Sequence, residues 1–170
     1  MADNRYNPNS VDFDFIDFYK KIEVDNKGLL ETVFRSATVD LAPLVKNYHI
    51  TDDQVWDISG KLYKLSLTYL TANHILQKLD PPRDKIEPPG PFATSEEAGE
   101  YVLASHRETV KKTVRGRSRS MVEKAELEVQ ESIHKHAPQI GEHELTALCN
   151  LVFAKIQKEL HIKAPGRSRG

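Results

Sequence analysis

The chain has 170 residues, of which 39% are hydrophobic and 29% charged, with a formal net charge of −1. This composition fits a protein with a core of its own and excludes a largely disordered chain. The single cysteine excludes an internal disulfide, and no apolar run approaches the roughly 18 residues that a membrane-spanning helix needs. We therefore expect no membrane partner and a cytoplasmic or virion location rather than a secreted one.

The charge is distributed unevenly along the chain. Residues 1–60 hold 6 Lys and Arg against 11 Asp and Glu, whereas residues 106–170 hold 13 against 8. Such asymmetry predicts a basic half that meets an anion, or copies that stack acidic end to basic end.

The first third of the chain predicts an arm followed by short helices. Residues 1–9 are expected to form an N-terminal arm. A helix should then start at a Ser10 cap, because apolar residues recur at helical spacing after it, although Val11–Phe15 alternates like a strand. A second helix is expected over Leu29–Ala37, and a short helix or helical turn over Leu41–Tyr48.

The strongest helical signal covers residues 51–79. Thr51 and Gln54 fit a capping box, in which each side chain binds a backbone N–H of the first turn. A seam of apolar residues follows at alternating spacings of three and four, from Val55 to Leu79. The seam predicts a core helix of a bundle rather than an oligomeric coiled coil.

The second half predicts a connector and further helices. Residues 80–94 are proline-rich and are expected to form a semi-rigid connector. A helix should open at a Thr94 capping box, break at Gly116 and restart at a third capping box on Ser120, ending before Pro138. A final helix is expected from Glu142 to His161, with residues 164–170 as a basic tail.

These elements predict an all-α fold of five to seven helices. We expect two lobes, residues 10–79 with the long helix and residues 95–163 with the basic segment, joined by the connector and flanked by extended arms at both ends. No phosphate-binding loop, nucleophile elbow or paired catalytic carboxylates stand out, so we expect no enzymatic activity, no cofactor and no metal.

The basic segment is the candidate functional site. Arginine alternates with small residues over 113–124, and the motif Gly-Arg-Ser-Arg recurs at the end of the chain. Arginines for bidentate contact and small residues for close approach suit a sugar-phosphate backbone. The predicted contacts are Arg107, Lys111, Lys112, Arg115, Arg117, Arg119, Arg167 and Arg169.

Other residue types carry weaker signals. Ser118 and Ser120 each follow arginines at positions −3 and −1, a pattern that suits phosphorylation by a basophilic kinase. His134 and His136 are two apart, which is poor metal-binding geometry on a helix. Cys149 lies among apolar residues and is expected to pack in the core.

The sequence therefore predicts a nucleic-acid-binding protein that assembles with copies of itself, of the capsid or nucleocapsid type. Single-stranded RNA, held through its sugar-phosphate backbone, is the expected ligand. The alternative hypothesis is a helical interaction or adaptor protein with a phosphorylatable basic loop.

Overall fold

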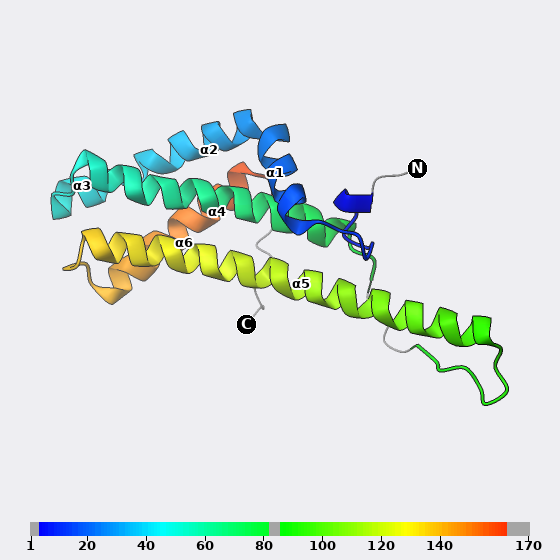
Figure 1. The fold of residues 1–170 in the computed structure, drawn as a ribbon. Coiled ribbons are helices and arrows are strands. Elements are labelled where there is room, and N and C mark those ends of the chain that lie inside the picture. Colours follow the sequence, from blue (N-terminus) through cyan, green and yellow to red (C-terminus); the bar gives the residue numbers. More distant parts are fainter. Residues whose placement is uncertain (1–3, 82–85, 163–170) are drawn as a thin grey trace.

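The computed structural model describes residues 4–81 and 86–162, and within them the protein is all-helical (Figure 1). A 3-10 turn, η1, covers Asn4–Tyr6. The helices are α1 Phe15–Asp25, α2 Lys27–Val39, α3 Ala42–Tyr48, α4 Asp52–Lys78, α5 Ser95–His136 and α6 Glu142–Glu159. The expected all-α class is confirmed.

Helix α4 is the centre of the bundle. Its capping box forms as predicted: the Gln54 amide donates to Thr51 Oγ1 at 3.3 Å, and the Thr51 amide donates to Gln54 Oε1 at 2.8 Å. Most of the predicted seam is buried in the core, with Leu65 and Tyr69 fully inaccessible, and Val55 and Leu76 are partly buried near its ends. The seam is therefore a core face within one chain.

One core unites the two halves of the chain. The buried seam of α4 lies against α5 residues Val122, Val129 and Ile133, and α6 closes the cluster with Val152 and Ile156. A second cluster joins α1 and the C-terminal half of α4 to Val114 of α5. The two predicted lobes are not confirmed, because residues from both sides of the proline-rich segment share this core.

The predicted N-terminal arm is not confirmed either. The Asn9 side chain accepts a hydrogen bond from the Asp80 amide and donates one to the carbonyl of Lys78, both at 2.8 Å. These two bonds tie the segment before α1 to the end of α4. Helix α1 begins at Phe15 rather than after Ser10, because the Asp14 carboxylate accepts the Asp17 amide at 3.0 Å and caps the helix.

The predicted helix break at Gly116 is wrong. Helix α5 runs without interruption for 42 residues from its Thr94 cap, and a Cβ at Gly116 would meet open space. A helical glycine costs only about 1 kcal/mol relative to alanine. Burial of Val114, Val122 and their neighbours against α1 and α4 outweighs that cost, so the third capping box at Ser120 does not form.

The first part of α5 projects beyond the bundle (Figure 1). Lys64 pairs with Glu128 at 2.9 Å and Arg115 reaches the Asp80 carbonyl at 3.3 Å, which sets α4 and α5 antiparallel. Helix α4 therefore ends opposite Arg115, and the 20 residues of α5 before it extend about 30 Å further. The non-helical segment 86–94 lies beside this projection.

We expect Gly116→Ala to stabilise the protein by up to about 1 kcal/mol, because alanine is the better residue inside a continuous helix. Gly116→Pro should cost at least about 3 kcal/mol, because proline removes a helical hydrogen bond and clashes with the preceding turn. Urea unfolding followed by circular dichroism measures both changes. A tolerated proline would restore the helix break that the sequence predicts.

Candidate nucleic-acid interface on helix α5

Six of the eight predicted phosphate contacts lie on α5, and Arg167 and Arg169 lie outside the described residues. Because α5 is helical, positions two apart are rotated by about 200° about its axis. The three alternating arginines therefore do not form one cluster. Arg115 and Arg119 lie on one flank of the helix, and Arg117 lies on the opposite flank.

Lys112, Arg115 and Arg119 form a single stripe, at positions i, i+3 and i+7 on consecutive turns. Lys112 and Arg119 are exposed, and Arg115 is half-buried at the end of α4. No carboxylate among the described residues forms an ion pair with any of the three. We call this set the basic stripe.

Arg117 is held on the other flank by an aromatic ring. Its guanidinium carbon lies 4.1 Å from the centroid of the Phe15 ring, at the start of α1. Such cation–π contact is worth about 0.5–2 kcal/mol and fixes the direction of the side chain. Arg117 therefore joins α5 to α1, and the exposed Lys124 lies two turns further along the same flank.

Lys111, one of the predicted phosphate contacts, is buried. Its ammonium is 3.0 Å from Glu108 Oε2, and both side chains are almost fully buried. The cost of moving the Lys111 charge out of water is offset here by the Glu108 carboxylate, so replacing Glu108 by a neutral residue would remove that compensation. Arg107, in contrast, is exposed on the projecting part of α5.

The two candidate phosphorylation sites differ in access. Ser118 is fully buried, and its hydroxyl donates to the carbonyl of Val114 at 2.9 Å. Ser120 is exposed on the outer surface of the same helix. The predicted basic loop around both serines is wrong, because both lie within the continuous helix α5.

His136 and Cys149 are explained by the surrounding structure. His136 Nε2 is 2.7 Å from Asp57 Oδ2, which also accepts the Ser132 hydroxyl at 3.1 Å. The His136 contact, with the Ser132 hydrogen bond, lowers the pKa of Asp57. Cys149 is buried as predicted, and desolvation raises the pKa of its thiol to about 11. No group of three metal-ligating side chains occurs in residues 4–81 and 86–162.

Within residues 4–81 and 86–162, every helix is too short or too polar to cross a bilayer.

Comparison with protein-family models, curated proteins and solved structures finds no match to this chain.

Sequence reasoning missed the basic stripe as a unit. The spacing of 112, 115 and 119 is visible in the sequence, but it aligns the side chains only on an uninterrupted helix. Because the sequence predicts a break at Gly116, the three alternating arginines were expected to form one surface of a loop. The alignment of positions 112, 115 and 119 was therefore not predicted.

Access to the serines can be tested with a basophilic kinase and mass spectrometry. We expect no phosphate on Ser118 of the folded protein, because its hydroxyl is inaccessible and the added dianion would enter the core. A peptide of residues 113–124 serves as the control and should be modified where the kinase prefers. Phosphate on Ser118 of the folded protein, without loss of helicity, would contradict the buried position.

Proposed function

We propose that this protein binds the sugar-phosphate backbone of single-stranded nucleic acid, RNA in the first instance, and assembles with copies of itself along the strand. It acts as a packaging protein of capsid or nucleocapsid type, in the cytoplasm or within a virion. The role is non-enzymatic, since it requires binding and no catalytic group.

The observation that carries the proposal is the basic stripe of α5. Three cations lie on one flank of the helix, along a stretch of about 10 Å measured parallel to its axis, because seven residues span that length. The intervals between them are about 4.5 and 6 Å, which is of the same order as the roughly 3.4 Å between phosphates along one strand of a duplex.

The chemistry of the stripe favours phosphates over bases. The guanidinium of Arg119 is exposed and offers the planar fork that matches phosphate oxygens. The chain has no Phe, Tyr or Trp between Tyr101 and Phe153, so α5 offers no aromatic platform for stacked bases along the stripe. Binding is therefore largely independent of sequence.

Self-association is supported by the shape and the charge of α5. Its projecting start carries Glu96, Glu97 and Glu100, all exposed, whereas the part that meets the bundle carries the stripe. A rigid helix with an acidic end and a basic middle can bring neighbouring copies together through opposite charges. Binding to one strand would raise the local concentration of copies further.

A specific observation favours the alternative role of a protein-interaction module. Trp56 is 66% exposed at the start of α4, and its ring lies 6.1 Å from that of Phe34 at the mouth of a pocket of about 340 Å³. Exposed aromatic residues beside a pocket are typical of protein interfaces. Size-exclusion chromatography with absorbance at 260 and 280 nm separates the two roles: nucleic-acid-loaded species support the first, and clean monomers or dimers the second.

The stripe can be tested with matched variants. Lys112→Gln/Arg119→Gln removes two exposed charges from the stripe, and Arg117→Gln/Lys124→Gln removes two from the opposite flank. Binding of a random-sequence single strand is measured at several salt concentrations. The stripe variant should lower the log–log salt slope by about 1.4, because each lost phosphate contact on a single strand contributes about 0.7.

The opposite-flank variant should retain most of the wild-type slope at the same net charge. Equal losses in the two variants would show that net charge alone attracts the strand. Unchanged binding in the stripe variant would remove Lys112 and Arg119 from the interface and leave the interaction-module role in its place.

A further inference from the structure

The face of α5 that packs on α4 continues beyond the point where α4 ends. From the buried Val114, this face runs towards the start of the helix at alternating spacings of four and three, through Val110, Arg107, Leu103 and Glu100. Val110 still packs partly on the cluster that joins α1, α4 and α5. Arg107, Leu103 and Glu100 are exposed, because α4 no longer covers them. A face that is core in the bundle is therefore without a partner over the projecting part of α5.

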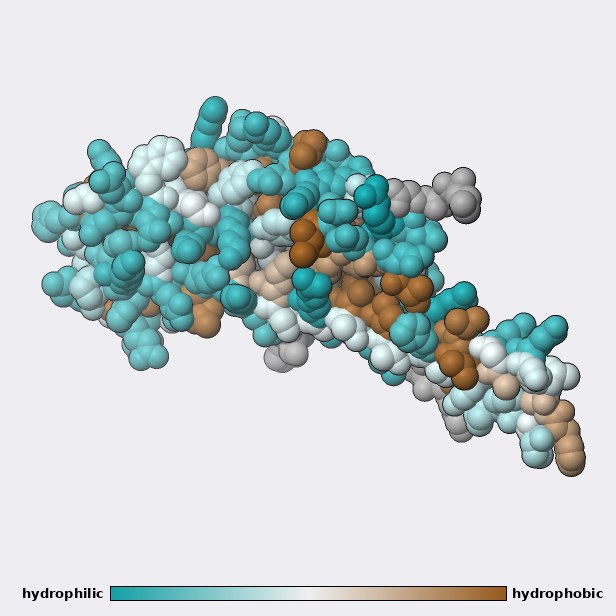
Figure 2. All heavy atoms as spheres, in the orientation of Figure 1, coloured by the Kyte–Doolittle hydropathy of each residue, from teal (hydrophilic) through white to brown (hydrophobic). Residues whose placement is uncertain are grey.

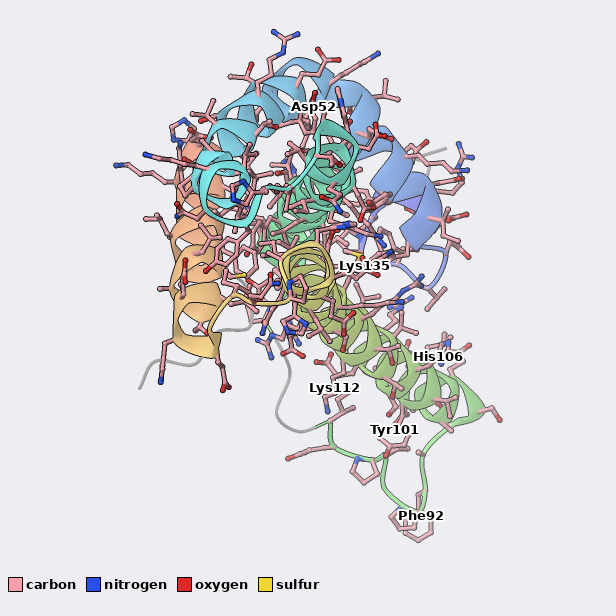
Figure 3. All side chains as sticks on the ribbon, turned by 90° about the vertical axis from the view of Figure 1, so that its left-hand side faces the viewer. Asp52, Phe92, Tyr101, His106, Lys112 and Lys135 are labelled. Carbon is pink, nitrogen blue, oxygen red and sulfur yellow. The ribbon has the colours of Figure 1, made fainter. Side chains whose placement is uncertain are left out.

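The loop before α5 leaves this face open. Phe92 and Tyr101 lie on the side of α5 that is turned away from α4 (Figures 1 and 3). Leu103 follows Tyr101 by two residues, so its side chain is rotated by about 200° about the helix axis. Leu103 is 55% exposed, and hydrophobic residues reach the surface along the projecting part of α5 in Figure 2.

The charges on this face are complementary to those of an identical face that runs in the opposite direction. Glu100 and Arg107 lie on either side of Leu103, three residues before it and four after it. Neither forms an ion pair among the described residues. In an antiparallel pair centred beside Leu103, each Glu100 faces the partner's Arg107. A parallel pair would instead bring like charges together, which costs free energy, so the pattern selects a second copy in antiparallel orientation.

The length of the projection fits the same arrangement. Helix α5 begins at Ser95 and α4 ends opposite Arg115, so Leu103 lies near the middle of the part that α4 leaves free. In the antiparallel pair, Ser95 of one copy reaches the level of the partner's Lys112. That level is about 4.5 Å short of the end of the partner's α4, because three residues of helix span this distance. The two bundles therefore lie at opposite ends of the pair and leave room for both helix starts.

We propose that two copies of this chain pair through the projecting parts of α5, antiparallel and related by a two-fold axis, with Leu103 at the centre and each Glu100 against the partner's Arg107. The inference deepens the self-association part of the proposed function and rests on it. The interface is isologous, because both copies contribute the same face. Exposed ion pairs set the orientation of the helices, and Leu103 and Val110 supply the apolar contact.

The test reverses the two charges one at a time in the full chain, after nuclease and high salt have removed nucleic acid. Self-association is measured by analytical ultracentrifugation at low salt. Glu100→Arg and Arg107→Glu each place like charges at both symmetry-related contacts, so each variant should dimerise at least roughly tenfold more weakly than wild type. An equimolar mixture of the two variants should dimerise again, because opposite charges meet in the heterodimer. The double variant Glu100→Arg/Arg107→Glu should recover dimerisation for the same reason.

Matched controls separate this face from general effects of charge and hydrophobicity. Glu31→Arg on α2 and Lys46→Glu on α3 reverse exposed charges on the bundle and should dimerise as wild type does. Leu103→Ala should weaken the dimer, whereas Val102→Ala should not, because Val102 is 63% exposed on another face of α5. Circular dichroism checks that every variant keeps its helices.

A wild type that stays monomeric at every concentration would overturn the pairing and leave the face to a helix of another protein. Single variants that dimerise as wild type does, or a mixture of them that stays monomeric, would overturn it as well. The stripe variant Lys112→Gln/Arg119→Gln changes neither Glu100 nor Arg107 and should dimerise as wild type does. Strand binding and pairing can therefore fail separately.

Discussion

The packing of α5 on α4 is the contact on which the rest of the structure depends. Ile58, Leu62 and Leu65 of α4 are buried in the same core as Val122 and Val129 of α5. Each of these side chains contributes about 1.5–3 kcal/mol when fully buried, so the contact holds α5 straight and fixes which of its faces meets the solvent. The positions of the basic stripe and of the projecting start of α5 both depend on this one interface.

Continuity of α5 gives its charged residues separate tasks. Lys111 forms a buried ion pair with Glu108, whereas Arg117 is exposed and lies over the Phe15 ring of α1. Lys112 and Arg119 remain exposed on the other flank. The set of exposed cations on this flank is therefore smaller than the run of arginines suggests, and the helix holds them in register.

The same continuity carries the start of α5 away from the bundle. The 20 residues of α5 before Arg115 extend about 30 Å beyond the end of α4 as a stiff helix. The basic stripe lies where α5 meets the end of α4, because Arg115 reaches the Asp80 carbonyl. The acidic residues Glu96, Glu97 and Glu100 at the projecting start are therefore separated from the stripe along one rigid helix.

The sequence by itself determined the helical class, the α4 seam and the two threonine caps, because periodicity and capping are local properties of neighbouring residues. It also determined that Cys149 is buried and that α5 ends before Pro138. Only the tertiary structure decided that α5 passes through Gly116, since the local cost of glycine is offset by burial against residues some fifty positions away. The continuity of α5 changed the candidate site, because it placed Arg117 on the flank opposite Arg115 and Arg119. It also accompanies the burial of Ser118 and Lys111 and leaves Phe92 exposed before the projecting start of the helix. Long-range packing, which no local pattern encodes, selected which of the charged residues face the solvent.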